Sequence, residues 1–224
     1  MSSTTLKYIA ILSMFIDHIG AILFPEIIGF RIIGRLAFPI FAFLLTEGFI
    51  HTKNIKRYTL RLVFFAIISE IPFNMAFYNR LFYMGHLNIF FTLLLGLVSL
   101  ILFEKYKDKK NLVGSLCVYM VMIIGLLLNV DYSIYGVLMI FVFYYFRYEY
   151  KKIVIYIGAI NTIIALSSFS INMNLQSLIQ LFAIVSLAVI ALYNGQKGKQ
   201  IQYFFYIFYP LHLMILYGAA LFFA

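Results

Sequence analysis

The stretch Asn111–Val130, NLVGSLCVYMVMIIGLLLNV, contains twenty consecutive residues without a charged side chain. About twenty apolar residues are what an α-helix needs to cross the hydrocarbon core of a bilayer. A transmembrane barrel strand would instead alternate polar and apolar residues over about ten positions. This stretch does not alternate, so it predicts a membrane-spanning helix.

The composition of the whole chain agrees with this prediction. Of the 224 residues, 64% are hydrophobic and only 11% are charged, whereas a soluble domain carries roughly 25% charged residues. So few polar side chains cannot cover a water-facing surface, which excludes a soluble globular protein. Only helices and closed barrels satisfy their backbone groups in lipid. We therefore expect one integral-membrane domain over residues 1–224, an all-α polytopic helical bundle.

Apolar runs of similar length recur along the chain. They predict about nine transmembrane helices, at residues 6–24, 29–50, 58–76, 87–104, 111–129, 132–147, 152–170, 175–193 and 203–222. The charge-free block from Ile153 to Gln196 is too long for one span, and the polar stretch INMNLQS divides it. The first apolar run has no small-residue cleavage site, so we expect no cleaved signal peptide.

The basic residues predict the orientation of these spans. The formal charge is +9, and fourteen of the seventeen Lys and Arg residues lie at the start of the first span or after the second, fourth, sixth and eighth. All of these places share one side of the membrane if there are nine spans. The positive-inside rule then puts the N-terminus in the cytoplasm and the C-terminus outside. We expect a multi-pass protein of a bacterial cell membrane, with no nucleic-acid partner.

Ten ionisable residues lie within or at the ends of these apolar segments. They are Asp17, His18, Arg31, Arg35, Glu47, His51, Glu70, His86, Asp131 and His212. Each costs at least about 2.5–3.5 kcal/mol near the bilayer centre, so such residues usually face the bundle interior or a cavity. Ion pairs that fix helix packing and functional groups are both consistent with this pattern.

Helical geometry restricts the pairings near the N-terminus. Asp17 and His18 are adjacent, so they point about 100° apart and do not form a dyad. Arg31 and Arg35 are four residues apart and share one face of the second span. We expect Asp17 and Glu70 to compensate these arginines, which leaves His18 to face a cavity.

Other polar groups lie near the ends of the spans. Glu47 shares a helix face with His51, because the two are four residues apart. His86 and Asn88 begin the fourth span, Asp131 and Tyr135 begin the sixth, and His212 lies in the ninth. Ordinary interfacial capping is an alternative role for His86 and Asp131. The four histidines lie on separate segments without the spacing of a metal site, so we expect no bound metal.

Four stretches carry a resemblance to a known family. They are LKYIAILSMFIDHIGAILFPE, RIIGRLAFPIFAFLLTEGFIHTKNIKRYTLRL, ISEIPFN and GHLNIFFTLLLG, and weaker similarity resumes at YSIYG and YPLHL. In their order and spacing they resemble the TraX family of membrane proteins. The family takes its name from a protein that acetylates the N-terminal amine of a conjugative pilin. It is also similar to a wider superfamily of integral-membrane acyltransferases that use cytoplasmic acyl-CoA.

The resemblance implies acetyl transfer from acetyl-CoA to an amine or hydroxyl of an acceptor outside the cytoplasm or in the bilayer. The acceptor would be a peptide, a pilin-like protein or a glycan. A catalytic histidine of an early helix in the superfamily corresponds by the motif to His18. The resemblance and the buried charges together predict catalytic roles for His18, Asp17, Arg31, Arg35, Glu70 and His86. They predict substrate or cofactor binding by Glu47, His51, Lys53, Lys56, Arg57, Arg61, Asn88, Asp131, Tyr135 and His212.

The chemistry of acyl transfer fits these residue types. A neutral imidazole is a natural base for the acceptor, or it carries the acyl group transiently. Arginines stabilise the oxyanion, and the basic cluster after the second span would hold the CoA phosphates unless it reflects only the positive-inside bias. A proton-coupled transporter or lipid flippase is an alternative, since buried charges also serve proton relays, although no inverted repeat is visible. A non-catalytic scaffold is a third.

Overall fold

The computed structural model describes residues 1–199 and 202–223, and within these ranges every regular element is a helix. Extended pairing in the same ranges is limited to an isolated bridge between Leu87 and Val130. The predicted all-α class is therefore confirmed. In chain order the elements are α1 (Ser3–Ile22), α2 (Ile28–Gly34), α3 (Ala37–His51), α4 (Ile55–Tyr78), α5 (Ile89–Tyr106), α6 (Leu112–Leu127), α7 (Ser133–Tyr145), α8 (Tyr150–Asn172), the 3₁₀ helix η1 (Leu175–Ile184), α9 (Val185–Ala191) and α10 (Gln202–Phe223).

Each of the nine expected spans falls on one of these helices or on two consecutive ones. Among the described residues, six segments are long and apolar enough to cross a membrane: α1, α2 with α3, α4, α5, α8 and α10. The remaining three expected spans coincide with the shorter apolar helices α6, α7 and η1 with α9. These features are those of a multi-pass membrane protein, while the count of nine stays a prediction.

The second expected span is not one continuous helix. Two turn residues, Arg35 and Leu36, separate α2 from α3. Pro39 lies in the first turn of α3, where its missing N–H leaves no hydrogen bond unmade. A helix running through this point would bring the Pro39 ring against the carbonyl group of Arg35, four residues earlier. Proline therefore explains why the helix restarts here and why Arg35 lies at a turn.

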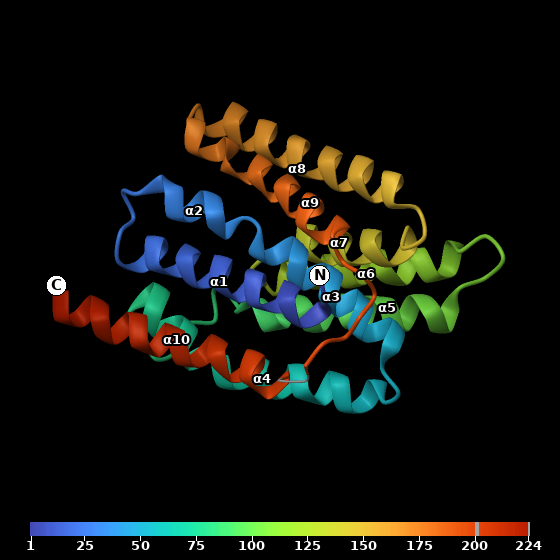
Figure 1. Ribbon diagram of the computed structural model, residues 1–224, viewed down its shortest axis with the longest axis horizontal. Helices are drawn as coiled ribbons and strands as arrows, with labels where there is room; N and C mark the ends of the chain where they lie inside the picture. Colours follow the sequence, from blue (N-terminus) through green and yellow to red (C-terminus); the bar gives the residue numbers. More distant parts are fainter. Residues whose placement is uncertain (200–201, 224) are drawn as a thin grey trace. The chain divides into compact units, whose positions relative to one another are not determined.

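The chain forms two compact units, the first from Met1–Leu44 and Tyr148–Ala224 and the second from Leu45–Arg147. In the first unit α1 packs between α2 and α10, and η1 packs along α8 and also contacts α2 (Figure 1). In the second unit α5 packs against α4, α6 and α7. Large apolar side chains remain exposed on the helices, such as Leu12, Ile163 and Leu211, as expected of faces that contact lipid.

One end of the first unit joins the N-terminus to the segment that precedes α10. The Ser3 amide donates a hydrogen bond to the Gln196 carbonyl oxygen at 2.8 Å, and the Thr4 hydroxyl donates to the Lys199 carbonyl oxygen at 2.7 Å. From this end α1 runs for 20 residues, or about 30 Å at 1.5 Å per residue. Its C-terminal end, near Leu23, therefore lies at the opposite end of the unit.

Candidate functional site

Asp17 on α1 is bound by two arginines. Arg31 Nη1 donates to Asp17 Oδ2 at 2.7 Å, and Arg35 Nη2 donates to Oδ1 at 3.2 Å. Arg31 also donates to the Asp17 backbone carbonyl oxygen at 3.2 Å. The Asp17 side chain is only 13% exposed. One carboxylate thus faces two guanidinium groups, and the cluster retains a net positive charge.

Gly34 allows α2 to approach α1 closely enough for these contacts. A Cβ atom at residue 34 would lie 2.0 Å from Asp17 Oδ1 and 2.3 Å from Asp17 Cβ. Because the Asp17 Cβ is attached to the backbone of α1, the two helices would have to move apart. The glycine therefore maintains the ion cluster even though it contributes no side chain to it.

We expect Gly34→Ala to lower the free energy of unfolding by about 1–3 kcal/mol, the usual cost of overpacking. The matched control is Gly29→Ala on the same helix, where an added Cβ meets nothing within 4 Å. There alanine should be neutral or stabilise the helix by up to about 1 kcal/mol relative to glycine. Thermal unfolding of both variants in detergent measures the difference. Equal stability of the two would contradict the close contact between Gly34 and Asp17.

His18 contacts a second histidine, on α10. His18 Nδ1 and His212 Nε2 are 2.6 Å apart, and the ring planes differ by 10°. His212 Nδ1 in turn lies 2.7 Å from the Phe208 carbonyl oxygen, and the His212 side chain is buried. Asp17 and His18 thus have different partners, in agreement with the divergence expected from helix geometry.

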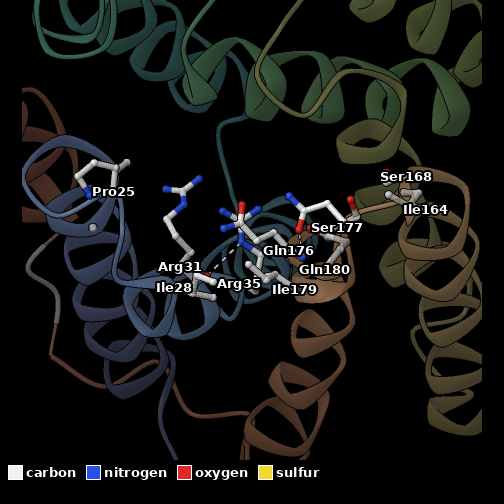
Figure 2. A pocket seen from close by; sticks show the side chains of 13 residues that line it. Pro25, Ile28, Arg31, Arg35, Ile164, Ser168, Gln176, Ser177, Ile179 and Gln180 are labelled. Carbon is white, nitrogen blue, oxygen red and sulfur yellow. Dashed lines mark hydrogen bonds between the residues drawn. The ribbon is translucent and has the colours of Figure 1, made fainter. Parts of the chain in front are cut away.

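A polar cavity of about 910 Å³ lies between α1, α2, α8 and η1. Figure 2 shows Arg31 and Arg35 lining it together with the amide and hydroxyl side chains of Gln176, Ser177 and Gln180. A cationic wall with neutral hydrogen-bonding groups suits a polar or anionic ligand. His18 is not a lining residue. This cavity therefore gives no support to the expectation that His18 faces a cavity. Arg31 and Arg35 line it instead.

Glu70 lies in the second unit, where its carboxylate is bound by Asn88. Its Oε2 accepts hydrogen bonds from Asn88 Nδ2 at 2.5 Å and from the Asn88 backbone amide at 3.3 Å. Asn88 Oδ1 also caps α5 by accepting from the Phe90 amide at 3.0 Å. Glu70 and the two arginines lie in different units, so compensation of an arginine by Glu70 stays a prediction. Asn88 joins α4 to the start of α5.

His86 and Asp131 meet outside the apolar segments of the second unit. His86 Nε2 lies 3.4 Å from Asp131 Oδ1, and both side chains are about one-third exposed. The hydrogen bond with Asp131 raises the pKa of His86 above its ordinary value of 6.5, and burial opposes this in part. Tyr135 was expected to bind substrate together with Asp131. Its ring packs against that of Tyr132, with the two ring centroids 5.9 Å apart.

This pair predicts a pH dependence of stability. A raised folded-state pKa means that the contribution of His86 is complete below 6.5 and disappears as the pH rises through the folded-state value. We expect His86→Gln to destabilise the protein at low pH by at most about 1 kcal/mol, because the pair is partly exposed. Above the folded-state pKa the variant and the wild type should converge. A stability difference that does not change with pH would contradict the pairing, and Asp131→Asn should reproduce the effect of His86→Gln.

The basic cluster predicted for CoA lies at the start of α4. Lys53, Lys56 and Arg57 are exposed. Arg61 packs its guanidinium over the Tyr58 ring at 5.6 Å, and its Nε is buried without a hydrogen-bond partner among the described residues.

Glu47 and His51 lie near this cluster in the sequence, on the last turns of α3. Their side chains are 3.9 Å apart, as their spacing predicts. His51 Nδ1 also lies 2.9 Å from the Glu47 backbone carbonyl oxygen.

Sequence reasoning missed several features of the first unit. The pairing of His18 with His212 joins residues 194 positions apart, and no local pattern indicates it. Asn161, buried in α8, accepts a hydrogen bond from Gln180 Nε2 at 2.9 Å. A polar residue inside an apolar run indicates that it needs a buried hydrogen-bond partner, so the sequence could have predicted this contact. Within residues 1–199 and 202–223, no three His, Cys, Asp or Glu side chains are grouped so that they could hold a metal ion.

Comparisons with known proteins identify relatives of the chain. The family described as TraX protein matches residues 2–220. A probable fimbrial assembly protein FimC, serogroup H1, from Dichelobacter nodosus is 30% identical over 99% of this chain and 96% of its own length. An uncharacterised protein of Rickettsia prowazekii is 38% identical over 30% of this chain and 25% of its own length. No solved structure matches the chain.

Proposed function

Because the chain belongs to the TraX family, we propose that it is a membrane-bound acyltransferase that passes acetyl groups from cytoplasmic acetyl-CoA to an acceptor. The acceptor presents an amine or a hydroxyl group outside the cytoplasm or within the bilayer. The observation that carries the proposal is the ionisable centre of the first unit, where the adjacent motif residues Asp17 and His18 meet two arginines and a second histidine. A peptide N-terminus is the preferred acceptor class, since a relative is named as a fimbrial assembly protein.

In the proposed reaction His18 removes a proton from the acceptor as its nitrogen or oxygen attacks the thioester carbonyl carbon. The carbon–sulfur bond then breaks, and the CoA thiolate leaves and takes up the proton from His18. Arg31 and Arg35 stabilise the negative charge that develops on the carbonyl oxygen. Asp17 holds both guanidinium groups in place, with N–O distances of 2.7 and 3.2 Å. Transfer through a transiently acylated His18 gives the same products.

The arrangement of the first unit supports the orientation predicted from the loop charges. The basic segment with Lys197 and Lys199 lies beside the N-terminus, whereas Gly20, Ala21 and Pro25 line the cavity at the other end of α1. In a nine-span bundle with a cytoplasmic N-terminus, the cavity belongs to the outer half of the membrane. We assign the polar part of the acceptor to it, facing Arg31 and Arg35.

The nucleotide part of the donor is assigned to the cytoplasmic side of the membrane, and its long pantetheine arm carries the thioester to His18 and the two arginines. Acetyl-CoA carries phosphates, and the exposed cations Lys53, Lys56 and Arg57 at the start of α4 suit them. Arg61 has a buried Nε without a partner among the described residues, so it has a donor to offer to a bound anion. Glu70 and His86 are assigned supporting roles from the second unit. The bilayer and acyl-CoA are the partners that the function requires.

The proposal is tested with purified protein in proteoliposomes and acetyl-CoA labelled on the acetyl group. Label should appear on an N-terminal peptide of a pilin from the same cell. In a separate binding titration, the triple variant Lys56→Gln, Arg57→Gln and Arg61→Gln should raise the Kd for CoA at least about tenfold, or about 1.4 kcal/mol. The control exchanges Lys109 and Lys110 in the α5–α6 loop for glutamine. If the protein neither binds CoA nor transfers the label, but takes up a solute in a proton-driven manner, the acyltransferase proposal is rejected in favour of a transporter.

A further inference from the structure

The two histidines of the first unit lie edge to edge. The ring centroids are 4.9 Å apart, His18 Nδ1 and His212 Nε2 are separated by 2.6 Å, and the planes differ by only 10°. The centroid separation of 4.9 Å exceeds the nitrogen separation of 2.6 Å by about twice the distance from an imidazole centroid to its ring nitrogen. This is the largest excess that the two rings allow, so both nitrogens lie on the line between the centroids, and the small interplanar angle makes the rings nearly coplanar. This is the geometry of an in-plane N–H···N hydrogen bond, not of two rings stacked face to face.

A backbone carbonyl determines which nitrogen carries each proton. His212 Nδ1 lies 2.7 Å from the carbonyl oxygen of Phe208, and a carbonyl oxygen can only accept, so His212 Nδ1 carries the proton. A neutral imidazole has one N–H and one acceptor nitrogen. His212 Nε2 is then the acceptor, and the proton between the two rings belongs to His18 Nδ1. The basic lone pair of His18 is therefore on Nε2.

The surroundings of His212 keep its ring in this orientation. The side chain is 2% exposed, and the rings of Phe15, Phe208 and Tyr209 pack around it with centroid distances of 5.9, 4.9 and 5.6 Å. Rotation of the ring would break both hydrogen bonds within an apolar site, where unmade hydrogen bonds are costly. His212 thus presents one acceptor in a constant position.

We propose that His212 is a positioning residue that fixes the tautomer of His18, so that Nε2 of His18 is the nitrogen that takes the acceptor's proton. His212 does not itself touch the reacting atoms. The partner of one imidazole nitrogen determines the protonation of the other, and in acyl transfer a base with the wrong tautomer cannot accept the proton. The role in the reaction rests on the proposed acyltransferase function, whereas the tautomer of His18 does not.

The tautomer is measured directly by ¹⁵N NMR of protein labelled on histidine and reconstituted in lipid, without acetyl-CoA. The chemical shift of each ring nitrogen distinguishes a protonated from an unprotonated atom, and variants of the other histidines assign the signals. In the wild type we expect His18 Nδ1 to be protonated and Nε2 to be unprotonated. A wild-type spectrum with the proton on His18 Nε2 would overturn the proposal, whatever the transfer assay shows.

Two substitutions of His212 separate positioning from packing. His212→Phe keeps a ring but removes the acceptor, so we expect the His18 proton to redistribute towards Nε2. Transfer should fall about 10- to 100-fold, less than the loss of the base itself, which contributes about 10²- to 10⁴-fold. In His212→Gln the side-chain oxygen reaches roughly the place of Nε2, so it should restore the tautomer and most of the rate. Leu211→Ala, at an exposed neighbour on α10, is the control and should change neither.

The outcomes distinguish this inference from the proposed function. An unchanged tautomer in His212→Phe would show that His212 does not set it, even if acetyl transfer is observed. A shifted tautomer with unchanged transfer would reject the role of Nε2 in the reaction. The absence of transfer in every form of the protein, together with the expected spectra, would reject the acyltransferase function and retain the paired histidines.

Discussion

Replacement of His18 with asparagine is expected to lower acetyl transfer by roughly 10²- to 10⁴-fold, the contribution that a general base makes. Asparagine is chosen because its side-chain amide reaches approximately the place of the imidazole Nδ1. It can still donate to His212 Nε2, which lies 2.6 Å from Nδ1 in the wild type, but it has no basic nitrogen at the position of Nε2. The substitution therefore removes the chemistry while retaining the contact between α1 and α10.

The loss should fall on kcat and leave the affinity for acetyl-CoA unchanged, because the base acts only in the transition state. Single-turnover transfer from labelled acetyl-CoA measures the first quantity, and a CoA titration measures the second. Leu12→Ala on the same helix, where the side chain is 58% exposed, should behave like the wild type. Wild-type transfer by His18→Asn in a correctly folded protein would exclude His18 as the base.

Removal of the Asp17 carboxylate is expected to destabilise the first unit strongly. Asp17→Asn removes the carboxylate that Arg31 and Arg35 share, and the side chains of Asp17 and Arg35 are only 13% and 18% exposed. Breaking a buried ion pair from one side costs about 3–5 kcal/mol. Because the Arg31 side chain is 34% exposed and can turn towards water, we expect a loss near the lower end, about 3 kcal/mol.

Unfolding in mixed micelles measures this loss, and a double-mutant cycle with Arg35→Gln attributes it to the pair. The second substitution should recover part of the loss, since one of the two uncompensated charges is then removed. Glu26→Gln deletes a carboxylate from the exposed segment between α1 and α2, and its effect should stay within about 0.5 kcal/mol. If Asp17→Asn were no more destabilising than Glu26→Gln, the ion cluster would have no structural role.

The cluster of Asp17, Arg31 and Arg35 shows which contacts the sequence alone could predict and which it could not. The spacing of Arg31 and Arg35 on one face, and the divergence of Asp17 from His18, follow from helix geometry over a few residues, and the structure agrees with both. That both arginines share Asp17 depends on how closely α1 and α2 approach, which Gly34 permits. Glu70 shows the same limit, because no local pattern indicated that the Asn88 side-chain amide, at the start of the next helix, donates to its Oε2 at 2.5 Å.

The sequence by itself determined where the apolar segments lie and that the chain is an all-helical membrane protein, because segment length and hydropathy are properties of consecutive residues. Even the break between α2 and α3 has a local cause, in Pro39. Only the tertiary structure decided that His18 meets His212, 194 residues later, and which ring nitrogen it uses. A buried polar group must find a hydrogen-bond partner, and the local sequence shows that need. The identity of the partner depends on which helices pack together, and helices distant in the chain decide it.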